Sequence, residues 1–320
     1  MDYRILGSTG VKVSPLCLGG MYFGWRNDEA ESVQIIHEAL ERGINFIDTA
    51  NVYANGLSEQ YVGKALRGKR DQVVLATKFR WGMGEGPNDE GAHRLHIRLQ
   101  VEKSLRRLQT DRIDLYQLHH PDPTTPLEET MEALTELVRQ GKVVYIGTSN
   151  FPAWQIVEAQ WIAERRSLVR FVCEQPHYSM LDRTLEREII PASRKYGIGI
   201  ICWCPLDGGM LTGKYRKGQP PPPDSRAIEE KWDLKSPESE RCLGAVERLD
   251  ALAEARGKTL SQFSLAWLLA NPAVTAPIVG PRTTEQLNDN IGALGWALGP
   301  EELAAVDAIV PPGTSVSAAG

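Results

Sequence analysis

The sequence of 320 residues lacks the features that mark several large classes of protein. Its net charge is −5, with 36 Lys and Arg against 41 Asp and Glu and no long basic run, so a nucleic-acid partner is not expected. No stretch approaches the roughly 20 apolar residues of a membrane span. The first residues show no basic segment followed by an apolar one. We therefore expect a cytoplasmic protein with no membrane partner.

Cysteine, histidine and glycine patterns argue against a metal site and against a nucleoside triphosphate site. The five cysteines form no paired CxxC set, so we expect free, mostly buried thiols. His119 and His120 are adjacent and would point to opposite faces of a strand, and we expect no metal site. A GxGxxG motif after a strand is absent, and the P-loop-like run at 208–215 has Tyr215 where Ser or Thr must bind Mg²⁺.

What the chain does contain is a regular alternation of short apolar runs, rich in Val and Ile, with longer segments of helical period. With 42% hydrophobic and 24% charged residues, the composition is that of a globular protein. Such alternation is typical of βα units and a parallel sheet. The expected strands are 16–19, 45–48, 73–78, 114–119, 143–149, 171–174, 197–204 and 276–280. Eight units predict a closed (β/α)8 barrel forming one domain over residues 1–320.

Three further segments are expected in addition to the eight strand–helix units. Residues 3–6 and 11–13 flank a Gly-Ser-Thr-Gly turn and predict a β-hairpin that plugs the bottom of the barrel. Residues from 207 to about 240 include four consecutive prolines and are too long for an ordinary βα connection, so we expect either a ligand-covering loop or a disordered spacer. After one more short helix, we expect a frayed tail over about 311–320.

Four chemically notable side chains fall at the ends of expected strands, which meet at one mouth of such a barrel. Asp48 ends the second strand with Tyr53 in the loop after it, Lys78 ends the third, and His119 ends the fourth. Taken singly, each has an ordinary structural reading as a helix cap, a neutralising partner or a packed core residue. Their joint occurrence at strand ends indicates a catalytic site.

The four side chains suggest a proton donor. A tyrosine hydroxyl, with a pKa near 10, is a poor acid, but an adjacent ammonium stabilises the phenolate, and we expect Lys78 to lower the pKa of Tyr53. Asp48 would keep Lys78 charged beside the core. His119 would orient a carbonyl oxygen. These residues describe a reduction site that lacks a source of hydride.

The motifs around these residues resemble those of aldo-keto reductases, which are NADPH-dependent (β/α)8 barrels. The resemblance extends over nearly the whole chain. The matching motifs, in order, are GINFIDTA at 43–50 with Tyr53, ATK at 76–78, DLYQLH at 114–119, GTSNF at 147–151, EQP at 174–176, WCPL at 203–206, and GPR at 280–282 ahead of EQL at 285–287 and Asn290. The resemblance implies NADPH-dependent reduction of an aldehyde or ketone, with Asp48, Tyr53, Lys78 and His119 as the catalytic tetrad and Tyr53 as the acid.

The resemblance also implies where the cofactor lies. Ser149, Asn150 and Gln175 would bind the nicotinamide carboxamide, with the indole of Trp203 stacked on the ring. Lys214 and Arg226 would bind the pyrophosphate, Arg282 the 2′-phosphate, and Gln286, Asp289 and Asn290 the ribose and adenine. Gly20, Met21, Cys204, Pro205, Leu206 and Gly280 complete the expected cofactor site. Arginine forms charge-assisted, often bidentate bonds to phosphate, so Arg282 argues for NADPH over NADH.

The substrate side is less defined by the sequence. Trp25, Phe79 and Trp81 are expected as walls of a pocket for a small carbonyl compound, although surface packing explains them almost as well. Pro-Asp-Pro at 121–123 resembles the bacterial reductase and potassium-channel β-subunit branch, which includes oligomers and regulatory proteins, so a homo-oligomer is allowed.

Two other functions stay open at this point. One is an NADPH-sensing regulatory or interaction subunit with slow, incidental reductase activity, against which the presence of His119 argues. The other is a lyase or isomerase that forms a Schiff base on Lys78, which leaves Trp203, Gln175 and Arg282 without a role.

Overall fold

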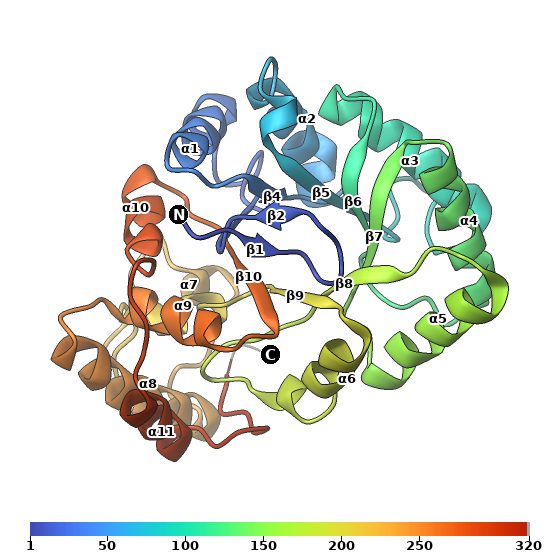
Figure 1. The fold of residues 1–320 in the computed structure, drawn as a ribbon. Coiled ribbons are helices and arrows are strands. Elements are labelled where there is room, and N and C mark those ends of the chain that lie inside the picture. Colours follow the sequence, from blue (N-terminus) through green and yellow to red (C-terminus); the bar gives the residue numbers. More distant parts are fainter. Residues whose placement is uncertain (319–320) are drawn as a thin grey trace.

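The computed structural model describes residues 1–318, and its centre is a closed barrel of eight parallel strands (Figure 1). Around the barrel the strands follow the order β10-β3-β4-β5-β6-β7-β8-β9. Their bounds are β3 Cys17–Gly19, β4 Phe46–Asp48, β5 Val74–Phe79, β6 Ile113–Leu118, β7 Val143–Ser149, β8 Phe171–Gln175, β9 Gly199–Cys202 and β10 Val274–Val279. The predicted (β/α)8 fold is confirmed, and each expected strand overlaps an observed one.

Helices surround the barrel, as Figure 1 shows. They are α1 Glu29–Glu41, α2 Leu57–Ala65, α3 Arg94–Leu108, α4 Leu127–Arg139, α5 Ala153–Arg166, α6 Ile189–Tyr196, α9 Leu260–Ala270 and α10 Thr284–Ile291, with α7 Arg226–Glu229, α8 Pro237–Ala255 and α11 Pro300–Ile309 added outside the repeat. Local signals set their ends. Asp28 caps α1 by accepting a hydrogen bond from the Glu31 backbone N–H at 2.9 Å, within a capping box.

The inside of the barrel is built in layers, because alternate residues of each strand point inward. Phe46, Ala76, Leu115 and Cys173 belong to one apolar cluster inside the barrel. Two residues further along the same four strands stand Asp48, Lys78, Gln117 and Gln175, which are all buried. The barrel interior therefore changes from an apolar layer to a polar one toward the carboxyl ends of the strands.

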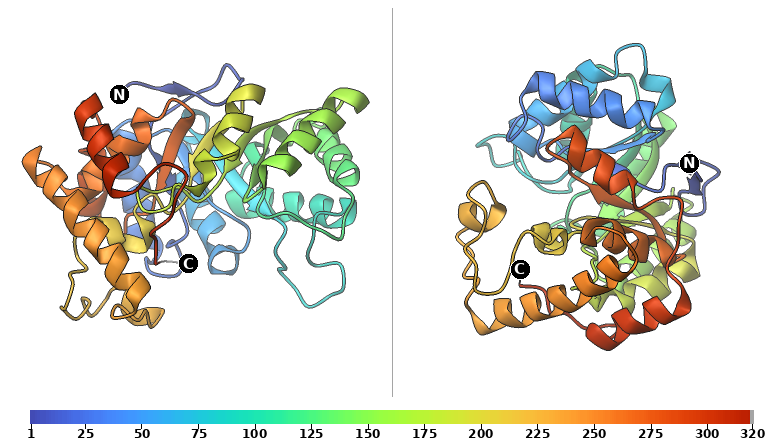
Figure 2. Two further views of the ribbon diagram at one scale, coloured as in Figure 1. Left: turned by 90° about the horizontal axis from the view of Figure 1, so that it is seen from below. Right: turned by 90° about the vertical axis from the view of Figure 1, so that its left-hand side faces the viewer.

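The predicted hairpin is present as β1 Arg4–Ile5 and β2 Lys12–Val13, and it closes the amino-terminal end of the barrel (Figure 1). Leu6 and Val13 belong to the apolar cluster inside the barrel. Gly7 has φ +54°, and a Cβ there would lie 2.2 Å from the carbonyl oxygen of Val172, so the close approach of the hairpin needs glycine. Figure 2 places the hairpin and the C-terminal tail at opposite ends of the barrel.

The long segment from 207 to about 240 is partly helical. It contains a 3₁₀ turn over Asp207–Thr212 and the short helix α7, and its last residues already belong to α8, which begins at Pro237. Proline at the first turn and Ser236 as the N-cap, which accepts from the Ser239 N–H at 3.1 Å, explain that start.

The expectation of a frayed tail over about 311–320 is wrong for the described part, and residues 319–320 lie outside the described residues. The Val316 N–H donates to the Leu181 carbonyl at 2.8 Å, and Ser315 forms a β-bridge with Asp182. The Ser317 hydroxyl donates to the Asp207 carboxylate at 2.9 Å. Hydrogen bonds to segments more than 100 residues away thus fix a sequence that looks unstructured on its own.

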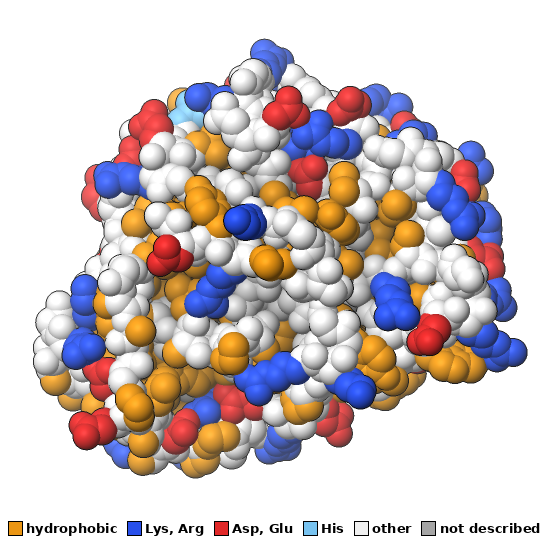
Figure 3. Space-filling view, viewed as in Figure 1, with side chains coloured by type: hydrophobic (Ala, Val, Ile, Leu, Met, Phe, Trp, Pro, Cys, Tyr) orange, Lys and Arg blue, Asp and Glu red, His pale blue; other side chains and the backbone are white. Residues whose placement is uncertain are grey.

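The surface on the hairpin side mixes charges of both signs with scattered apolar side chains (Figure 3). None of the helices formed by residues 1–318 combines the length and apolarity needed to cross a bilayer. Within residues 1–318, no group of three or more His, Cys, Asp or Glu side chains is arranged to hold a metal ion.

Candidate active site

A cavity of about 770 Å³ opens at the carboxyl ends of the barrel strands. Most residues expected from the sequence to act on substrate or cofactor line this one cavity. They are Gly20, Met21, Asp48, Tyr53, Trp81, His119, Ser149, Asn150, Gln175, Trp203, Cys204, Pro205, Leu206, Lys214, Arg226, Gly280, Arg282, Gln286, Asp289 and Asn290. Residues up to 270 positions apart are therefore brought to a single concave site.

Lys78 and Asp48 form a buried ion pair at the floor of the cavity, which Asp48 lines. Their side chains are 0% and 3% exposed, and the Lys78 ammonium donates to the Asp48 carboxylate. The same ammonium donates to the Thr49 carbonyl at 2.9 Å and to the Tyr53 hydroxyl oxygen at 3.3 Å. One cation thus connects the buried carboxylate to the tyrosine that faces the cavity.

The other oxygen of Asp48 is also bound. It accepts the Gln117 side-chain amide at 2.9 Å and that of Gln175 at 3.0 Å. The carboxylate therefore has hydrogen bonds on both oxygens, which is how a buried charge is stabilised. Gln117 was absent from the expected site, although its position two residues before His119 in the strand indicates an inward side chain.

The pKa values of Lys78 and Tyr53 follow from burial and mutual charge. Although burial lowers the pKa of Lys78, Asp48 and Tyr53 outweigh it and hold that pKa above its ordinary value. Burial raises the pKa of Tyr53 above 10, and the charge of Lys78 only partly offsets this. The expected lowering of the tyrosine pKa is therefore wrong in its net direction. At neutral pH, Tyr53 keeps its proton and Lys78 keeps its charge.

His119 lies beside the tyrosine. The two rings are 5.8 Å apart and nearly perpendicular. Burial, followed by the charges of Lys78, His120 and Arg80, lowers the pKa of His119 well below its ordinary value. The imidazole is therefore neutral at neutral pH. Among the described residues, its buried Nδ1 has no hydrogen-bond partner.

An aromatic and amide surface forms another wall of the cavity. The Trp203 indole N–H donates to the Asn150 side-chain oxygen at 3.0 Å. The Asn150 amide donates to the Ser149 hydroxyl at 3.1 Å, and that hydroxyl donates to the Gln175 carbonyl at 2.8 Å. The Trp203 side chain keeps about a third of its surface exposed, and it lines the cavity. A planar ring of a ligand could therefore stack on the indole, with the side-chain amides of Asn150 and Gln175 nearby.

The far end of the cavity is cationic. Burial, followed by the charges of Arg282 and Arg226, lowers the pKa of Lys214, so these three cations repel one another. Arg226 is paired with Glu230 at 2.5 Å, whereas Arg282 donates to the uncharged backbone carbonyl of Asp224 at 3.3 Å. This end of the cavity is chemically suited to an anion.

Two of the three expected substrate-pocket aromatics lie elsewhere. Phe79 is fully buried and stacks on Tyr116 at 4.7 Å, because it follows the inward-facing Lys78 and so points outward into the helix layer. Trp25 is 56% exposed and stacks on Tyr22, which lines the cavity, but Trp25 itself does not line it. Trp81 alone of the three lines the cavity.

Several lining residues were missed by sequence reasoning. Tyr22 and Arg26 lie in the loop between β3 and α1, and Arg26 forms an ion pair with Glu229 of α7 at the cavity rim. His120 lines the mouth directly after His119. The signal for all of them was their position in loops after strand ends, which is shared by many uninvolved residues.

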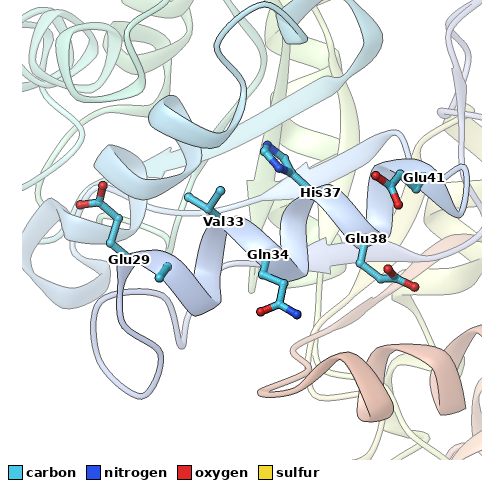
Figure 4. Close-up of a pocket in the computed structure, with 7 residues that line it drawn as sticks. Glu29, Val33, Gln34, His37, Glu38 and Glu41 are labelled. Carbon is cyan, nitrogen blue, oxygen red and sulfur yellow. The ribbon is translucent and has the colours of Figure 1, made fainter.

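A second hollow lies on the outer face of α1 (Figure 4). Its lining comes from one helix, with Glu29, Glu38 and Glu41 along its exposed side and Val33 and His37 beside them. A groove of this kind lacks the convergent polar groups of the barrel cavity, which we therefore take as the active-site candidate.

A buried carboxyl behind the cavity gives the fold a pH dependence. Burial raises the pKa of Glu174 to about 8, although Thr148 and the Phe151 N–H, at 3.1 Å, donate to it. The folded state therefore holds a proton that the unfolded state loses near pH 4.3. Stability from this proton is present at low pH and is lost as the pH rises through about 8.

We expect the free energy of unfolding of the wild type, relative to Glu174→Gln, to fall by up to about 1.4 kcal/mol per pH unit between pH 5.5 and 7.5. Urea denaturation at half-unit intervals measures this difference. Parallel stability curves for the two proteins would contradict the assignment, because the neutral amide cannot titrate.

Residues 15–311 match the family model described as "Aldo/keto reductase family". The chain is 45% identical to "Uncharacterized oxidoreductase YrpG" of Bacillus subtilis, covering 97% of this chain and 96% of that protein. It is 39% identical to "Probable voltage-gated potassium channel subunit beta" of Arabidopsis thaliana, covering 92% and 91%, and 37% identical to "Norsolorinic acid reductase" of Aspergillus flavus, covering 97% and 81%.

Proposed function

The chain belongs to the aldo/keto reductase family of oxidoreductases, and from this premise we propose that it reduces aldehydes or ketones to alcohols with NADPH. One observation carries the proposal: the Lys78 ammonium contacts both the buried Asp48 carboxylate and the hydroxyl of Tyr53 at the cavity wall. This arrangement suits proton donation to a developing alkoxide. A Schiff base on Lys78 is disfavoured, because that reaction needs a neutral amine and the pKa of Lys78 is raised.

In the proposed reaction, side chains of this protein donate the proton and orient the substrate. The neutral imidazole of His119 orients the carbonyl oxygen beside Tyr53. Tyr53 donates its proton to that oxygen, and the Lys78 ammonium stabilises the phenolate left behind. NADPH, when bound, supplies the hydride. Asp48 holds Lys78 charged throughout the cycle.

The residues of the cavity fit this cofactor by their chemistry. Lys214 and Arg282 offer cationic groups to a pyrophosphate and a 2′-phosphate, and the repulsion between them and Arg226 is relieved when anions enter. At the other end, Trp203 presents a flat face, and the amides of Asn150 and Gln175 lie within reach of a carboxamide. The ends of the cavity thus match the two ends of a nicotinamide dinucleotide.

We expect Arg282→Met to raise the Kd of NADPH about 10- to 100-fold while changing the Kd of NADH less than threefold. The reason is that a charge-assisted bond to phosphate contributes about 1.5–3 kcal/mol, and only NADPH carries the 2′-phosphate. Titration of protein fluorescence with each nucleotide measures both constants. Arg98→Met on the exposed face of α3 is the matched control. Equal weakening of both nucleotides would contradict the assignment of Arg282 to the 2′-phosphate.

The experiment that tests the function is steady-state oxidation of NADPH and NADH by the purified protein over a panel of aldehydes and ketones. Turnover that prefers NADPH is the expected result. Trp81 and His120 at the mouth favour aromatic or apolar carbonyl compounds, which should rank first. Tight NADPH binding with no turnover on any substrate would overturn the reductase proposal.

The second candidate function is an NADPH-sensing regulatory subunit, and the 39% identity to a protein named as a potassium channel β subunit favours it. The discriminating measurement is a single turnover, in which the protein with bound NADPH is mixed with an aldehyde. Oxidation within seconds supports the enzyme. Oxidation over hours, with NADPH still tightly bound, supports the sensor.

A further inference from the structure

His177, which the sequence did not suggest as a site residue, packs directly against Trp203, the residue proposed to contact the nicotinamide ring. The imidazole of His177 stacks on the indole of Trp203 with ring centroids 4.6 Å apart and planes inclined by 23°. The two residues form a parallel β-bridge, and the backbone N–H of Trp203 donates to the backbone carbonyl of Pro176 at 3.0 Å. One face of the indole is thus covered by His177, which leaves the other face for the cavity.

His177 is clamped between two carboxylates. Its Nδ1 lies 3.4 Å from an oxygen of Asp182, and its Nε2 lies 3.4 Å from an oxygen of Asp207. A carboxylate at each ring nitrogen requires both nitrogens to carry hydrogen, which is the imidazolium form. Although burial lowers the pKa of His177, the two carboxylates raise it to about 9.

The carboxylates are themselves held by neighbouring segments. Asp207 is fully buried and accepts the hydroxyls of Ser179 at 3.2 Å and of Ser317, from the C-terminal tail, at 2.9 Å. Asp182 accepts the N–H and the hydroxyl of Thr184 at 3.0 and 2.7 Å. Asp182 and Asp207 are the charged groups that act most strongly on His177. The clamp is therefore a preorganised unit rather than a chance contact.

We propose that His177, as an imidazolium held by Asp182 and Asp207, is a positioning residue that fixes the plane of the Trp203 indole on which the nicotinamide ring packs. The inference rests on the proposed use of NADPH and extends it to a residue behind the cavity. Asn150 fixes the edge of the indole through the indole N–H, and His177 fixes its face. A cation against an indole face adds attraction to this stacking.

The clamp has a pH signature that requires no cofactor. An imidazolium in contact with an indole quenches its fluorescence, so the emission of Trp203, taken as wild type minus Trp203→Phe, is expected to increase as the pH rises through about 9. In His177→Gln, the emission of Trp203, taken as this variant minus His177→Gln/Trp203→Phe, should not change with pH. Asp182→Asn keeps the stacked ring but removes one carboxylate, so the midpoint should fall by about one pH unit or more.

The second measurement is NADPH binding. His177→Gln at pH 7 is expected to raise the Kd and KM for NADPH about five- to tenfold, with a smaller change in kcat, because the Trp203 indole is displaced while Tyr53 is untouched. The wild-type KM should approach that of the variant above pH 9. His37→Gln, on the outer face of α1, is the matched control.

The outcomes separate the two proposals. Absence of NADPH binding by the wild type overturns the proposed function, while the fluorescence titration still decides whether the clamp exists. NADPH binding by the wild type that is unchanged in both His177→Gln and Asp182→Asn overturns the positioning role. A Trp203 emission that is flat from pH 7 to 10, or that changes equally in His177→Gln, also overturns it.

Discussion

Tyr53→Phe is expected to lower kcat about 10²- to 10⁴-fold while leaving the Kd of NADPH within a factor of two. The substitution removes only the hydroxyl oxygen that lies 3.3 Å from the Lys78 ammonium. The ring keeps its packing against His119, and Lys78 keeps its ion pair with Asp48. The proposed reaction therefore loses its proton donor without losing its binding surface.

Steady-state kinetics with the preferred carbonyl substrate, together with NADPH titration, measure both quantities. Tyr61→Phe on α2 is the matched control, since it removes a hydroxyl at a position outside the cavity. Activity retained in Tyr53→Phe would transfer the role of acid to another group of the cavity. Loss of NADPH binding would instead make Tyr53 a structural residue.

The sequence was sufficient to predict the barrel, because the pattern of a strand followed by a helix occurs eight times along the chain. Each apolar strand run is short and ambiguous alone, but the regular alternation with helical segments admits few architectures. The start of α1 at Asp28 is likewise set by local sequence, since a capping box uses residues close together in the chain. Local chemistry that recurs along the chain is what a single sequence carries well.

Contacts between residues that are far apart in the sequence could not be predicted. The tail was expected to fray, yet Ser317 donates to Asp207 across 110 positions, and no local pattern announces such a pair. The direction of the Tyr53 pKa failed for a related reason: the effect of the Lys78 charge was foreseen, but the larger effect of burial depends on the packing of the whole cavity. Phe79 is different, because strand alternation after an inward Lys78 already indicated that it points outward.

Lys78→Met is expected to lower the free energy of unfolding by about 3–5 kcal/mol and to abolish turnover. Met fills a similar volume but leaves the Asp48 carboxylate buried without its cation, with only Gln117 and Gln175 still donating to it. Lys64→Met, which breaks the exposed pair with Glu29 at 2.5 Å, is the control and should cost about 1 kcal/mol or less.

A double variant separates the unpaired charge from the loss of the lysine itself. Asp48→Asn/Lys78→Met removes the unpaired charge and should recover much of the lost stability. Urea denaturation of the single and double variants measures the loss and the recovery. A loss below about 1 kcal/mol in Lys78→Met, or no recovery in the double variant, would show that the pair does not act as a buried ion pair. Because Tyr53 depends on the same ammonium, recovery of stability without recovery of turnover is the result that assigns Lys78 a catalytic function separate from its structural one.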